Sequence, residues 1–133
     1  MEAHTSTQPT GGVAQAHRIL AFIVFGGGIL QFLLAGYAAF GGSSYSAHRG
    51  VGEVITVIAL IVLVLAFVGR REAVPASALL FGLLVLQNIL GAAGDSAPAL
   101  GALHPVNGLL ILGAAMAASA GRPIGRPHGR ARA

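Results

Sequence analysis

The sequence predicts an all-α integral membrane protein, a four-helix bundle that crosses the bilayer four times. Hydrophobic residues make up 55% of the 133 positions and charged residues only 9%, whereas a soluble domain carries about 25% charged residues. The chain contains four apolar stretches, each close to the ~20 residues that a helix needs to span ~30 Å of hydrocarbon. These stretches cover residues 17–40, 49–68, 75–94 and 104–120.

Each stretch is interpreted as a helix, because in lipid a segment must satisfy its own backbone amides. Within the interiors of the four stretches the only formal charge is Glu53. The fourth stretch, 104–120, is short and rich in Ala and Gly, so a re-entrant segment is the alternative to a full crossing. Residues 1–16 and 121–133 are expected to form disordered tails, the second of them basic.

Arginines orient the predicted bundle. With four crossings both termini share one side, and that side carries Arg18, Arg70, Arg71 and the tail arginines Arg122, Arg126, Arg130 and Arg132. The opposite side carries only Arg49. This bias predicts cytoplasmic N- and C-termini, in a multi-pass protein of a bacterial plasma membrane.

Composition also limits the partners. The chain has no cysteine, which excludes disulfides, thiolate metal sites and iron–sulfur clusters. The basic C-terminal tail fits contact with lipid headgroups. No aromatic residues interleave its arginines, so we expect no nucleic-acid partner. The expected partner is the lipid bilayer, and a homodimer is an open alternative.

An internal repeat divides the chain into two hairpins. Residues 25–34, FGGGILQFLL, match residues 81–90, FGLLVLQNIL, at an ungapped offset that places Gln31 on Gln87 and His48 on His104. Each copy crosses the membrane twice, so the copies are related by a pseudo-twofold axis along the membrane normal. The second helix then lies opposite the fourth, and the first opposite the third.

The repeat brings two histidines to one depth. His48 and His104 begin their helices near the outer face and point across the pseudo-axis. Two imidazoles placed in this way form an axial pair for the iron of a haem b. Arg49 is positioned to pair with a haem propionate, and glycines near this level leave room for the ring. The competing interpretation is that both histidines only cap helices.

Other polar residues in the spans are candidate cofactor-binding groups. Glu53 either balances a ferric haem or relays protons, or it is a protonated carboxyl bonded to a neighbouring helix. Gln31 and Gln87, near the midplane, either contact the cofactor or join helices. Asn107 lies three residues after His104 and is expected to orient that ring or a propionate.

A zinc site at the histidine pair and the role of His17 are two further points. Zinc fits less well than haem, because it prefers three or four ligands. His17 lies at the cytoplasmic end, where its repeat counterpart is Ala73. We interpret His17 as an interfacial residue and leave open a second site on that side.

The segment LQNILGAAGDSAPALGALHPVNGLLIL resembles half of a haem A synthase, the cytochrome oxidase assembly family. The chain is similar also to small four-helix membrane proteins of this plan. The family has two tandem four-helix bundles, each with a histidine pair on its second and fourth helices, and one half binds haem b. The resemblance implies that the pair here is His48, in AHRG, and His104, in LHPV, and that the partners are oxidase-assembly or respiratory membrane proteins.

One departure from the family bears on activity. The catalytic half of the synthase carries Glu-x-x-His-Arg, and Tyr45 occupies the Glu position here. The chain also forms one bundle rather than two. No catalytic residue is therefore assigned, and the expected function is haem binding for electron transfer or haem handling. The alternatives are a cofactor-free structural subunit, or an enzyme of haem modification or quinol oxidation that acts with a partner.

Overall fold

The computed structural model describes residues 10–94 and 96–120, and these form four α-helices without a strand. The predicted all-α four-helix bundle is confirmed, and all four helices are long and apolar enough to cross a membrane. A single 3₁₀ turn, η1, precedes the third α-helix. The elements are α1 (Thr10–Ala39), α2 (Ser46–Gly69), η1 (Arg71–Ala73), α3 (Val74–Ala93) and α4 (Pro98–Ala120).

All four helices begin earlier than predicted, the second and third by three residues and one residue, the first and fourth by six or more. The first helix starts at Thr10 rather than at residue 17, so part of the predicted disordered tail is helical. Val13 explains this extension, because its side chain packs so closely on α2 that a Cβ at Gly69 would lie 2.7 Å from Val13 Cγ1. The fourth helix starts at Pro98, and proline is favoured in the first turn of a helix.

The fourth helix is therefore continuous over 23 residues and is long enough for a full crossing. His104 consequently lies in the second turn of α4 rather than at its start. Residues 1–9 of the predicted N-terminal tail and the whole predicted C-terminal tail, 121–133 with its four arginines, lie outside the described residues.

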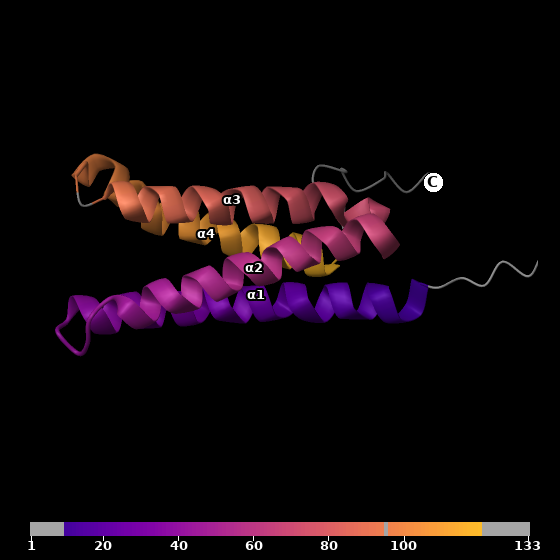
Figure 1. The fold of residues 1–133 in the computed structure, drawn as a ribbon, viewed down its shortest axis with the longest axis horizontal. Helices are drawn as coiled ribbons and strands as arrows, with labels where there is room; N and C mark the ends of the chain where they lie inside the picture. The colour runs from indigo at the N-terminus through magenta and orange to yellow at the C-terminus, as the bar shows by residue number, and fades with distance from the viewer. Residues whose placement is uncertain (1–9, 95, 121–133) are drawn as a thin grey trace, which may run out of the picture.

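The helices form two antiparallel hairpins, as Figure 1 shows. The α1–α2 and α3–α4 connections lie at one end, called here the hairpin end. The start of α1, the α2–α3 turn and the end of α4 lie at the other, called the terminal end. Each hairpin packs internally, and α1 packs on α4 while α2 packs on α3. The diagonal pairs are therefore α1 with α3 and α2 with α4, as the repeat predicts.

The terminal half of the bundle is tightly packed by small residues. Fully buried alanines from α1, α2 and α4 let the helices approach closely, which is how helices in lipid gain van der Waals contact. Large apolar side chains such as Leu33 and Val68 are exposed on the outside, where lipid would cover them. The buried alanines of this core include Ala21, Ala59, Ala66, Ala115 and Ala118.

Glycines shape the two connections at the hairpin end. Gly41, after α1, has φ = +83°, a left-handed conformation that glycine adopts without steric cost. Between α3 and α4, a Cβ at Gly94 would lie 3.2 Å from the Cα of Gly101. The two backbones therefore touch where the second hairpin turns, which fixes the path of the chain into the helix that carries His104.

Candidate cofactor-binding site

A cavity of about 940 Å³ opens between the four helices in the hairpin half of the bundle. Its volume falls within the ~300–1,000 Å³ of pockets that hold small molecules and cofactors. All four helices contribute to its wall, and glycines recur on each of them. The lining glycines are Gly28, Gly36, Gly52, Gly91, Gly94, Gly101 and Gly108.

The two histidines of the repeat meet in this cavity. His48 and His104 both line it, and their ring centroids lie 5.8 Å apart with an interplanar angle of 59°. When two imidazoles bind opposite sides of one metal ion, each through an N–metal bond of about 2 Å, their ring centres lie roughly 6 Å apart. The predicted pairing of the two rings is thus present, at a separation that suits a shared ligand.

Backbone carbonyls orient both imidazoles. The Nδ1 atom of His48 lies 3.2 Å from the carbonyl oxygen of Gln31, and that of His104 lies 3.1 Å from the carbonyl oxygen of Gln87. A carbonyl oxygen only accepts, so each Nδ1 carries the proton and donates it. In the neutral imidazole each Nε2 then keeps its lone pair, which is the state in which a histidine ligates a metal.

The glycines make room for these side chains. A Cβ at Gly52 would lie 2.7 Å from Nε2 of Gln31, and a Cβ at Gly91 would lie 3.2 Å from Cε1 of His104. At Gly36 a Cβ would meet nothing within 4 Å, so the cavity is open there. The residues present fit a flat ligand held between the two imidazoles.

The two glutamines behave differently. The Gln87 side chain accepts a 2.7 Å hydrogen bond from Nδ2 of Asn107, which also donates to the carbonyl oxygen of Leu83 at 2.9 Å. Asn107 is 4% exposed and ties α4 to α3 instead of orienting the His104 ring. The counterpart of Asn107 in the first hairpin is Val51, and the buried Oε1 of Gln31 has no partner among the described residues.

The α2 wall of the cavity is polar. Tyr45, Arg49 and Glu53 all line it, and the Tyr45 ring stands edge-on to His48 with centroids 6.1 Å apart. Arg49 and Glu53 are exposed, and within the described residues neither forms an ion pair. No hydrogen bond joins Glu53 to a neighbouring helix in that part of the chain, so the alternative interpretation of Glu53 as an interhelical link is not supported there.

A zinc site of ordinary composition is not present in the described segments. No three side chains of His, Cys, Asp or Glu gather within residues 10–94 and 96–120, and structural zinc takes four ligands. The histidine pair supplies two ligands, which is the number an axial pair requires.

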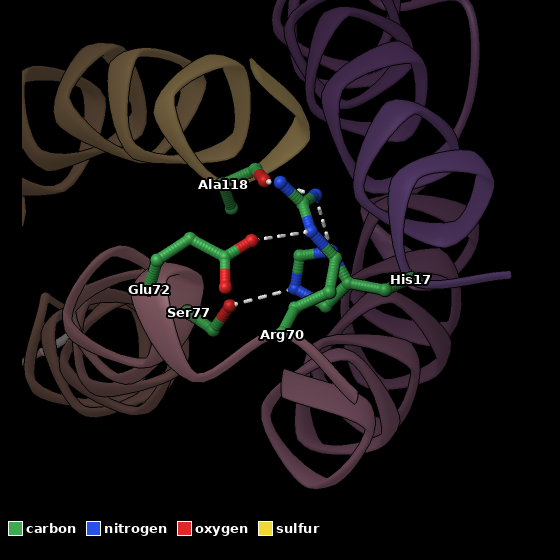
Figure 2. A network of polar contacts seen from close by, with 5 residues as sticks. All are labelled: His17, Arg70, Glu72, Ser77 and Ala118. Carbon is green, nitrogen blue, oxygen red and sulfur yellow. Dashed lines mark hydrogen bonds and ion pairs between the residues drawn. The ribbon is translucent and has the colours of Figure 1, made fainter. Parts of the chain in front are cut away.

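His17 belongs to a separate network at the terminal end, shown in Figure 2. The interfacial interpretation of this residue is wrong, because His17 is 0% exposed. Its Nε2 lies 3.0 Å from Oγ of Ser77, and its Nδ1 lies 3.2 Å from Nη1 of Arg70. Arg70 also pairs with Glu72 at 3.1 Å and donates to the carbonyl oxygen of Ala118 at 3.5 Å.

This network occupies both nitrogens of His17. A guanidinium only donates, so Nδ1 of His17 accepts from Arg70 and Nε2 carries the proton donated to Ser77. Arg70 and Ser77 were missed from the sequence, where Arg70 counted only as a charge between helices. Ala73, the counterpart of His17 in the repeat, is also 0% exposed, so the two equivalent positions both face the core.

Comparison with known protein families gives a match of unknown function. The model of a family described as a family of unknown function, DUF6220, matches residues 31–93, which is less than half of the chain. The matched segment includes Gln31, His48 and Gln87 and ends before His104. No curated protein and no solved structure matches the chain significantly.

Proposed function

We propose that this chain is a membrane haem protein that holds a b-type haem through His48 and His104. The observation that carries the proposal is the pair of imidazoles 5.8 Å apart in a cavity of about 940 Å³. Both rings donate through Nδ1 to a main-chain oxygen, which leaves both Nε2 lone pairs free for iron.

Other residues of the cavity suit the rest of a haem. Arg49 lines the exposed part of the wall and is placed to pair with a propionate. The Gln31 and Gln87 side chains also line the cavity, and the Glu53 carboxyl stands on its α2 wall, where it would balance the charge of a ferric haem. A bound haem would supply one-electron redox chemistry, for electron transfer or for haem handling in oxidase assembly.

The arginine bias supports an orientation for this bundle. Arg18, Arg70 and Arg71 lie toward the terminal end, and Arg49 lies toward the hairpin end. By the positive-inside rule the terminal end faces the cytoplasm, so the haem would sit in the outer half of a bacterial plasma membrane. The resemblance to one half of a haem A synthase supports respiratory or oxidase-assembly proteins as partners.

An absorption spectrum of the purified protein tests the proposal. Protein from haem-replete cells should show a Soret band that shifts on reduction, with one haem per chain. His48→Ala and His104→Ala should each lower the haem content at least tenfold, because a single axial ligand holds the iron weakly. His4→Ala, a matched substitution in the sequence that precedes α1, should leave it unchanged.

The same experiment separates the proposal from a structural role. A colourless wild-type protein, together with a double His48→Ala, His104→Ala variant that folds normally, would contradict haem binding. It would favour a cofactor-free subunit.

A further inference from the structure

The two hairpins differ where the cavity wall reaches the outer surface of the bundle. Between α2 and α3, the wall includes Arg49, Glu53 and Asn88, all lining the cavity and all exposed. Asn88 Nδ2 donates to Thr56 Oγ1 at 3.2 Å, and this hydrogen bond joins α3 to α2 at this part of the wall. These four residues are called the α2–α3 face.

The repeat gives this face an apolar counterpart. At the same offset, the positions of Arg49, Glu53, Thr56 and Asn88 are taken by Pro105, Leu109, Leu112 and Phe32. These residues belong to α4 and α1, which pack together, and they are called the α4–α1 face. One side of the cavity thus meets lipid with hydrogen-bonding groups, and the other side meets it with hydrocarbon.

Polar groups that face lipid are costly unless something covers them. Glu53 lies seven residues into α2, about 10 Å along the axis from the hairpin end. Asn88 lies five residues before the end of α3, at a similar depth of about 8 Å. The phosphate of a lipid headgroup stays at the interface, so the occupant of this face carries its polar group into the hydrocarbon region.

We propose that the α2–α3 face binds the ring of a lipid-soluble quinol. The Arg49 guanidinium has five N–H donors, more than one propionate would use, and the Glu53 carboxylate offers acceptors. The amide oxygen of Asn88 is a further acceptor, beside the Nδ2 that donates to Thr56. Arg49 and Glu53 are four residues apart on α2 and so share one side of the helix. A ring with two oxygen substituents spans such a set, and its apolar tail lies along the exposed apolar surface.

The inference goes beyond haem binding and does not need the haem. It concerns a second ligand at the rim of the cavity, and it names binding only, without a reaction. Its failure and the failure of the haem proposal are therefore separable.

Photolabelling tests this site. The full chain in lipid nanodiscs is illuminated with a ubiquinone analogue that carries a diazirine on a short alkyl tail, after reduction to the quinol. We expect labels on peptides of α2 and α3, removed by excess decylubiquinol. Labelling that persists in His48→Ala shows that the quinol site does not depend on haem. The same labelling in a colourless wild-type protein would support the quinol site while contradicting the haem proposal.

Matched variants sharpen the test. Asn88→Leu should weaken competition by decylubiquinol about tenfold, the effect expected when a hydrogen bond to the ligand is lost. Glu53→Gln, which keeps the size of the side chain, should weaken it severalfold. Phe32→Leu changes the counterpart of Asn88 on the α4–α1 face and should alter it less than twofold.

Three results would overturn the proposal. They are labels spread evenly over all four helices, equal losses in Asn88→Leu and Phe32→Leu, or crosslinks between two copies of the chain through the α2–α3 face with no quinol label there. The last result would assign the face to a homodimer.

Discussion

At the terminal end of the bundle His17 uses both ring nitrogens, whereas at the hairpin end His48 and His104 each use one. His17 donates through Nε2 to Ser77 and accepts at Nδ1 from Arg70. His48 and His104 donate through Nδ1 to carbonyl oxygens and turn toward a cavity. The three residues have the same chemistry, but their neighbours leave them with opposite tautomers.

The packing around the two ends differs in the same sense. Alanines fill the terminal half, so His17 has no space beside it and holds helices together. Glycines line the hairpin half, so space remains beside His48 and His104 for a ligand. A histidine in a membrane bundle is therefore a candidate ligand when it keeps a free lone pair and has a cavity beside it, and a structural residue when it has neither.

The largest expected effect comes from filling the cavity without changing His48 or His104, the proposed haem ligands. Gly36 lines the cavity, and a Cβ there would meet nothing within 4 Å. Gly36→Phe should place a ring in the space that a haem needs and lower the haem content at least tenfold. Gly26→Phe is the control, because Gly26 is equally open but does not line the cavity. Equal haem content in the two variants would show that the cavity is not the binding site.

The second largest expected effect is a loss of stability that comes from the terminal end alone. Arg70→Ala removes the donor that reaches Nδ1 of the buried His17 and the carbonyl oxygen of the buried Ala118, which costs about 1–3 kcal/mol. Unfolding in mixed detergent micelles, followed by circular dichroism, measures this loss. The neighbouring and exposed Arg71→Ala should cost less than about 0.5 kcal/mol. A loss as large in Arg71→Ala would mean that the network contributes little.

A smaller effect should follow from exchanging the residues that make the two hairpins unequal. Asn107→Val removes both hydrogen bonds between Asn107 and α3, and interhelical bonds in membranes are worth about 0.6 kcal/mol each. We expect a loss of about 1 kcal/mol in the same unfolding assay, with the His104 ring still held by the Gln87 carbonyl.

The reverse exchange should give the smallest change. Val51→Asn supplies a donor beside Gln31, whose Oε1 is buried without a partner in the described part of the chain. The expected gain is about 0.5 kcal/mol, and Val51→Leu serves as the apolar control. A destabilised Val51→Asn variant would indicate that the Gln31 amide oxygen is already satisfied, by water or by a ligand.

The sequence predicted the fold and the histidine pair because both depend on spacing along the chain. The lengths of the apolar stretches predicted the four helices. The offset of the repeat predicted that His48 and His104 lie at the same depth on diagonal helices. Spacing does not set where a long side chain turns. Arg70 could extend outward to the interface or inward to His17, and only the packed helices decide between these. The Asn107 bond to Gln87 was missed for the same reason, since both rotamers must be known.

Each imidazole at the hairpin end is hydrogen-bonded to a main-chain carbonyl oxygen rather than to another side chain. A side-chain acceptor disappears when one codon changes, but the carbonyl oxygen at position 31 or 87 exists whatever residue stands there. Gln31→Leu should therefore leave the orientation of His48 intact. Residues around the pair can therefore be substituted without changing the orientation of the two Nε2 lone pairs. The histidine geometry tolerates mutations of its neighbours for this reason.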